Sequence, residues 1–157
     1  METVYTPTAL ILARQSVISV PNTSAEGVKK GAYIVSQDEN PQVVMIASGS
    51  EVSTLMAGAE LLRAEGIRLQ IVSVPSEAIF RQQSKEYQAE VLPQGVARFG
   101  LTAGLPCNLE GLVGEHGTVW GLNSFGFSAP YKVLDEKLGF TAENVYNQVK
   151  QLLASNI

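Results

Sequence analysis

The feature that most constrains the fold is a regular alternation of strand-length apolar runs with segments of helical spacing. Val43 to Ala47 is apolar at every position, which is typical of a strand buried on both faces of a sheet. Ser50 to Gly66 follows with apolar residues at helical offsets and a glycine at its end, and Arg68 to Val74 is another apolar run. Such a strand-helix-strand unit has a right-handed connection and parallel strands. The chain is therefore predicted to have an α/β fold.

The same pattern continues on both sides of this unit. Further strands are predicted at the short apolar runs Ala9 to Ala13, Ala32 to Val35, Val96 to Leu101 and Thr118 to Leu122. Ala103 to Gly117 is glycine-rich and is expected to be a surface loop with at most one helical turn. Near the end, one helix opens at Pro130 and stops at Gly139, and another begins after Thr141. Residues 1–157 are predicted to form a single domain in which 1–24 are a lead-in strand and loop.

The composition excludes several classes of function. The 157 residues carry 11 basic and 15 acidic side chains, giving a formal net charge of −4, whereas nucleic acids and acidic membranes require clustered positive charge. Apolar residues at 45% and charged residues at 17% are typical of a globular protein. No run approaches the roughly 20 apolar residues that span a bilayer. Because the single cysteine, Cys107, cannot form an internal disulfide, a cytoplasmic protein is expected, with no nucleic-acid or membrane partner.

Few side chains offer chemistry of their own. His116 is the only histidine and lies in a turn-like sequence, Gly114 to Gly117, so it is interpreted as an exposed loop residue. With one histidine and one thiol, neither a nucleophile-base pair nor a thiolate metal site is indicated. The glycine motifs that bind phosphates, G-x-x-x-x-G-K-S/T and G-x-G-x-x-G, are absent. No catalytic, cofactor-binding or metal-ligating residue is therefore predicted.

Two features are candidate binding sites. Ser48, Gly49 and Ser50 form a turn into a helix, and the first amides of a helix are unpaired donors that can hold an anion. The alternative is that Ser50 only caps that helix. Arg14 follows an apolar run at the position where α/β proteins place ligand groups, and a guanidinium can bind a phosphate through two parallel hydrogen bonds. The alternative for Arg14 is a surface charge or a partner in an ion pair.

Several segments resemble, in order and at compatible spacing, motifs of the C-terminal domain of transketolases. Pro7 to Gln15 resembles PTALILSRQ, Glu26 to Tyr33 resembles EGxxKGAY, Ala47 to Val52 resembles ATGSEV, Val72 to Phe80 resembles VSMPSxxxF, Tyr87 to Pro93 resembles YxxxVLP, and Phe125 to Thr141 resembles the FGASAP and GFT ending. The resemblance covers almost the whole chain. It implies a three-layer α/β/α sandwich whose sheet is mainly parallel, with one antiparallel edge strand.

The resemblance also implies a function. Transketolases are thiamine-dependent transferases that move a two-carbon ketol unit between sugar phosphates in the pentose phosphate pathway. Arg14 matches the arginine of the SRQ motif, which helps to hold the phosphate of the sugar. Thiamine diphosphate and its divalent metal, magnesium or calcium, are held by two preceding domains, whose GDG motif is absent from this sequence.

These implied properties make the chain one part of a larger enzyme. It is expected to bind no cofactor, to be inactive alone, and to work with the cofactor-binding domains and the sugar phosphate in an enzyme that is a homodimer. Because only a few residues separate Met1 from the first motif, an expressed fragment or a split subunit is expected.

The sequence departs from the family pattern in one region. Leu101 to Gly114 stands where the family commonly reads VEAGxxxGWxKYVG, so the acidic residue, Trp, Lys and Tyr of that stretch are replaced. Ala13 likewise replaces the motif serine beside Arg14. Dimer or ligand contacts of that loop are therefore not carried over to this chain.

Two other functions remain open from the sequence. One is a free-standing regulatory module that holds an anionic metabolite at the Ser50 helix start and the glycine-rich loop. The other is the C-terminal domain of a related thiamine-dependent enzyme, such as a transketolase-like protein, a pyruvate dehydrogenase beta subunit or a deoxyxylulose phosphate synthase.

Overall fold

The structure is a computed structural model that describes residues 9–12 and 15–155. Its centre is a five-stranded sheet in the order β1-β3-β2-β4-β5. The strands are β1 (Tyr33–Gln37), β2 (Val43–Ala47), β3 (Leu69–Ser73), β4 (Ala97–Leu101) and β5 (Thr118–Trp120). β1 pairs antiparallel with β3, and every other pair is parallel. The mainly parallel sheet with one antiparallel edge strand is therefore confirmed.

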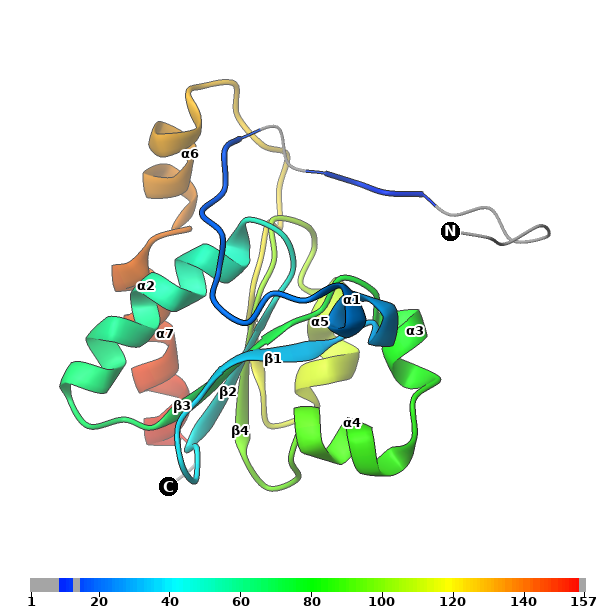
Figure 1. Ribbon diagram of the computed structural model, residues 1–157. Coiled ribbons are helices and arrows are strands. Elements are labelled where there is room, and N and C mark those ends of the chain that lie inside the picture. Colours follow the sequence, from blue (N-terminus) through cyan, green and yellow to red (C-terminus); the bar gives the residue numbers. More distant parts are fainter. Residues whose placement is uncertain (1–8, 13–14, 156–157) are drawn as a thin grey trace.

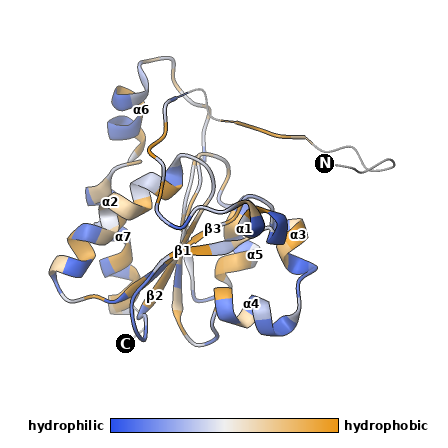
Figure 2. Ribbon diagram, viewed as in Figure 1, coloured by the Kyte–Doolittle hydropathy of each residue, from blue (hydrophilic) through white to orange (hydrophobic). Residues whose placement is uncertain are grey.

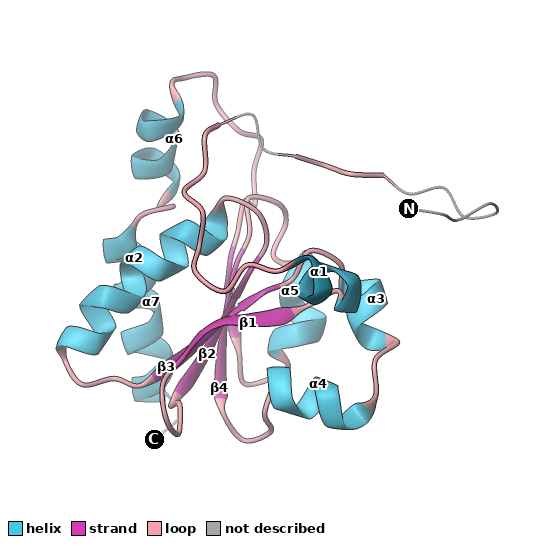
Figure 3. Cartoon of the chain, in the orientation of Figure 1, coloured by secondary structure: helices cyan, strands magenta, loops and turns pink. Residues whose placement is uncertain are grey.

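Helices cover both faces of the sheet, as Figures 1 and 3 show. They are α1 (Ala25–Lys30), α2 (Glu51–Ala64), α3 (Glu77–Arg81), α4 (Lys85–Val91), α5 (Cys107–Val113), α6 (Tyr131–Leu138) and α7 (Ala142–Ser155). α2 and α7 pack on one face, and α3, α4 and α5 contribute the core of the other. This arrangement confirms the predicted three-layer sandwich.

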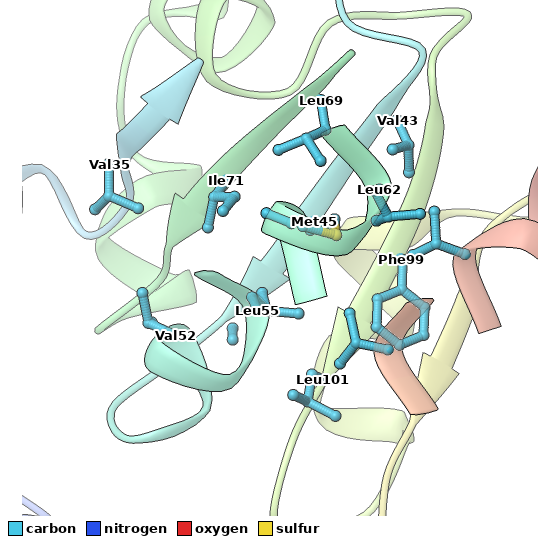
Figure 4. Packing of buried hydrophobic residues seen from close by; sticks show 14 of the residues in the cluster. Val35, Val43, Met45, Val52, Leu55, Leu62, Leu69, Ile71, Phe99 and Leu101 are labelled. Atoms are coloured by element: carbon cyan, nitrogen blue, oxygen red, sulfur yellow. The ribbon is translucent and has the colours of Figure 1, made fainter. Parts of the chain in front are cut away.

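β2 explains why the core divides into two clusters. All of its residues are buried, and alternate side chains point to opposite faces of the sheet. Val43, Met45 and Ala47 belong to the cluster under α2 and α7, where Leu55 and Phe99 also lie (Figure 4). Val44 and Ile46 belong to the cluster under α3, α4 and α5. A strand buried on both faces of a sheet must be apolar throughout. The uninterrupted apolar run Val43 to Ala47 therefore predicts both ends of β2 correctly.

The predicted lead-in strand is not observed. Residues 9–12 are described but form no strand, and Ala13 lies outside the described residues. Leu10, Ile11 and Leu12 are exposed at 69%, 96% and 80%, and the segment runs away from the body of the domain (Figure 1). Figure 2 shows it coloured as a hydrophobic stretch. Residues 9–12 therefore pair with no described strand in this chain, and a strand requires a neighbour with which to pair its backbone.

The glycine-rich stretch after β4 also differs from expectation. It contains α5 rather than a surface loop, and Leu109, Leu112 and Val113 are buried against the sheet. Their spacing places them on one side of a helix, and the burial of that side stabilises a helix that its sequence alone does not favour.

Candidate functional site

The carboxyl ends of the parallel strands form the edge at which α/β proteins bind ligands. β2 leads there into Ser48, Gly49 and Ser50, and α2 begins at the next residue. Gly49 has a φ of +62°, a conformation that glycine adopts without strain. The structure therefore places the candidate helix start of the sequence at this edge.

Ser50 occupies the N-cap position of α2 but does not cap the helix with its side chain. Its backbone is already helical, with φ −62° and ψ −30°, and its Oγ donates a hydrogen bond to Oε1 of Glu51 at 2.7 Å. Side-chain capping requires an extended backbone that turns the hydroxyl back toward the later amides. Ser50 is therefore the N-cap residue of α2, as the sequence indicates, but its side chain does not make the capping hydrogen bond.

The Glu51 carboxylate lies at the start of α2 instead. It accepts hydrogen bonds from the Ser50 hydroxyl, from its own backbone N–H and from the N–H of Ala103, in the loop after β4. Burial raises the pKa of Glu51 above its ordinary value, the nearby Asp135 adds to this effect, and the three hydrogen bonds oppose it. An added anion would have to lie beside this carboxylate, so the geometry does not favour an anion at Ser48, Gly49 and Ser50.

A hollow of about 680 Å³ lies between this edge and the lead-in segment, by which we mean the described residues that precede α1, 9–12 and 15–24. We call it the lead-in hollow. Its walls include Ile11, Leu12, Val17 and Ile18 on the lead-in side, and Gly49, Ser50, Ser53 and Ser73 on the side of the domain. All described residues that line it are apolar side chains, neutral polar side chains or glycine. The structure thus brings the residues flanking Arg14 in the sequence close to the helix start.

Arg14, the predicted substrate-binding residue, lies outside the described residues together with Ala13. Leu12, two positions before it, and Val17, three positions after it, both line the lead-in hollow. Sequence reasoning did not identify this hollow because its walls come from segments that only the fold brings together.

The other reactive side chains do not form a site with one another. Cys107 begins α5 and is exposed, whereas His116 follows the same helix in a turn. Among the described residues, no group of three His, Cys, Asp or Glu side chains could hold a metal ion. In the part of the chain that is described, no helix has the length and apolar character required to cross a membrane.

Comparison with known proteins supplies the family. Residues 31–141 match the family described as transketolase-like TK C-terminal domain. The transketolase of Aquifex aeolicus is 44% identical over 148 residues, which are 91% of this chain and 22% of that protein. The solved transketolase from Leishmania mexicana superposes with a TM-score of 0.84 at 35% identity, covering 90% of this chain and 21% of that one.

A third likeness supports the fold alone. A solved "Split gene transketolase, inactive beta4 tetramer" matches with a TM-score of 0.67 at 23% identity, covering 90% of this chain and 48% of that one. This chain spans less than a quarter of the length of the Aquifex relative, of which it covers 22%. The family match over most of the domain, the relative at 44% identity and the shared fold together show that this chain belongs to the transketolase family, in which it corresponds to the C-terminal domain.

Proposed function

We propose that this chain works as the C-terminal part of a transketolase, which transfers a two-carbon ketol unit between sugar phosphates. The observation that carries the proposal is the match of residues 31–141 to the C-terminal domain of the family. The chain contributes a phosphate-binding arginine and packing surface. Partner domains supply thiamine diphosphate and a magnesium or calcium ion, and the complete enzyme is a homodimer. Without those domains the chain is inactive.

The proposed role of Arg14 rests on its surroundings in the sequence and on the lead-in hollow. Leu12 and Val17 place the chain on either side of Arg14 at this hollow, and no acidic residue is among the described residues that line it. A phosphate entering there would meet hydroxyl groups and apolar walls, with the Glu51 carboxylate next to the lining residue Ser50, so it needs a positive charge beside it. A guanidinium supplies the charge and the paired donors that hold such a group.

The exposed lead-in segment supports the proposed partner. Leu10, Ile11 and Leu12 together with Val17 and Ile18, exposed at 54% and 80%, form an apolar surface that the described part of the chain leaves open to water. Exposed apolar surface of this kind marks an interface with another protein surface. The cofactor-binding domains of the enzyme are the partner that we assign to it.

Reconstitution tests the proposal. The chain is mixed with a polypeptide that contains the cofactor-binding domains, and ketol transfer between sugar phosphates is measured. Transfer that requires both components supports the proposal, and the absence of both a complex and activity at micromolar concentration would contradict it.

Arg14→Ala tests the phosphate role in the reconstituted enzyme. We expect the Michaelis constant for a sugar phosphate to rise about 10- to 100-fold, with a much smaller change for an unphosphorylated donor, because only the former loses the charged hydrogen bonds. Arg68→Ala is the matched control, since Arg68 directly precedes β3, at the opposite edge of the sheet. An equal effect on both donors would rule out the phosphate role.

A further inference from the structure

A second hollow, of about 270 Å³, is lined mainly by residues of α3, α4 and α5. These helices lie on the face of the sheet opposite α2 and α7 (Figure 1). We call this hollow the basic hollow. Its polar walls are formed by Arg81, Lys85, Gln88, Gln94 and Arg98. No acidic residue is among the described residues that line it, although the chain as a whole has a net charge of −4. A local excess of positive charge attracts anions into such a concave site.

Arg98 supplies a cation that no acidic group balances. It lies near the start of β4, where Nη1 donates to the carbonyl of Leu112 at 2.9 Å and Nη2 donates to the carbonyls of Leu92 and Pro93, both at 3.0 Å. Its Nε is buried and has no hydrogen-bond partner. Burial lowers the pKa of Arg98, and no described carboxylate forms an ion pair with it. Arg98 is half-buried, and a partly desolvated charge without a counter-charge is less favourable than a paired one, so a bound anion would be attracted to it.

The remaining two cations of the basic hollow differ in their partners. Arg81 forms an ion pair with Glu77 at 2.5 Å and donates to the carbonyl of Gly111 at 3.0 Å, so its charge is already balanced. Lys85 forms no ion pair with any residue that the structure describes. Lys85 and Arg98 are therefore the two positive charges available to a ligand.

We propose that the basic hollow binds the phosphoryl group of a small phosphorylated metabolite, at a site separate from Arg14. Lys85 supplies a mobile point charge, and Arg98 supplies a guanidinium charge held in place by its three hydrogen bonds to carbonyls. A water molecule takes about 30 Å³ in the liquid, so a hollow of about 270 Å³ has room for a phosphoryl group and a short carbon chain. The site does not depend on the proposed transketolase activity, because its residues lie on α3, α4, α5, β4 and the segment between α4 and β4, away from the lead-in hollow.

Titration of the isotope-labelled chain followed by NMR tests this site, with inorganic phosphate and glycerol 3-phosphate as the probes. Ionic strength is held constant with chloride. We expect saturable shifts of backbone amides that concentrate at Gln88, Gln94 and Gly111. Because Lys85 has no ion pair to lose, Lys85→Gln is expected to preserve the fold while weakening binding about fivefold or more.

Lys132→Gln is the matched control, since it removes one lysine charge from α6, outside the basic hollow. We expect this variant to bind both probes as the unaltered chain does. Arg98→Lys keeps the positive charge but removes the planar guanidinium group. Its affinity for the probes is compared with that of the unaltered chain once its NMR spectrum shows that it is folded. Three results would overturn the proposal: no saturation by either probe below about 10 mM, equal affinity in Lys85→Gln, or shifts spread evenly over the surface lysines.

Discussion

Glu51 shows how a single side chain can connect segments that are far apart in the sequence. Its carboxylate accepts from the Ser50 hydroxyl and from the amide of Ala103, so it joins the start of α2 to the loop after β4. The sequence places Glu51 correctly in the first turn of a helix, beside the positive end of the helix dipole. It could not indicate the contact with Ala103, because that contact exists only once β2 and β4 lie side by side.

The raised pKa of Glu51 predicts a particular dependence of stability on pH. Because the folded-state pKa lies above the unfolded value, the native chain holds the proton more tightly than the unfolded chain between these two values. The free energy of unfolding should therefore fall as the pH rises through that window, and this contribution stays lost at higher pH. In Glu51→Gln the contribution is absent, so the variant should gain stability relative to the unaltered chain as the pH rises through the window.

Urea unfolding of both proteins at a series of pH values between about 4 and 8 measures this difference. Glu60→Gln is the matched control for the loss of one charge, because Glu60 lies on the same helix and its side chain is 74% exposed. If the free energy of unfolding had the same pH dependence in Glu51→Gln and in the unaltered chain, burial would not raise the pKa of Glu51.

At the scale of elements, apolar runs predict the sheet well because burial on both faces leaves little choice of residue. The observed bounds of β1, β3, β4 and β5 lie within two residues of their predicted ranges. α5 escaped prediction because Gly111 within it and the glycines on either side weaken the local signal, although Leu109, Leu112 and Val113 follow helical spacing. Local propensity is a poor guide where packing against the sheet decides the conformation.

The packing of α2 against α7 predicts an unusual effect of Gly58→Ala. A Cβ at Gly58 would lie 2.5 Å from Cγ1 of Val145 and 2.8 Å from its Cβ. Alanine normally stabilises a helix interior by about 1 kcal/mol relative to glycine, but overpacking a core costs about 1 to 3 kcal/mol. We expect Gly58→Ala to lower the free energy of unfolding by about 1 kcal/mol, because the clash outweighs the gain in helix propensity.

A double-mutant cycle with Val145→Ala separates the two contributions. Val145→Ala removes Cγ1, the atom nearest to the new Cβ, but keeps the Cβ of residue 145 at 2.8 Å, so Gly58→Ala should be less destabilising in that background. Chemical denaturation of the four proteins gives the coupling energy. The same destabilisation in both backgrounds would show that Val145 is not the cause.

At the scale of the molecule, the domain is well packed on both faces of its sheet but open at the edge that carries the candidate site. The lead-in segment is apolar and exposed, and within α6, all of which the structure describes, no residue is buried. The sequence could predict that this edge would carry the site, because parallel strands end there. It could not predict the lead-in hollow, and it assigned the Ala9 to Ala13 run to a sheet in which the described residues 9–12 do not take part.

The exposure of the lead-in segment leads to a prediction that separates folding from assembly. Leu10→Ser, Ile11→Thr and Leu12→Ser combined should change the free energy of unfolding of the chain by less than about 0.5 kcal/mol, because exposed side chains lose little on substitution. The same variant should bind the cofactor-binding domains much more weakly than the unaltered chain, since the interface loses its apolar surface. Urea unfolding and sedimentation of the mixed components measure the two effects.

Leu61→Gln is the control for the loss of exposed apolar surface, since Leu61 is 40% exposed on α2, outside the lead-in segment. It should leave assembly unchanged. If the combined variant unfolded at lower urea, the segment would belong to the core of this domain. If it assembled normally, the interface would have to lie elsewhere. Residues 9–12 are apolar, exposed and unpaired with any described strand, and assembly of the combined variant tests whether a second polypeptide surface covers them.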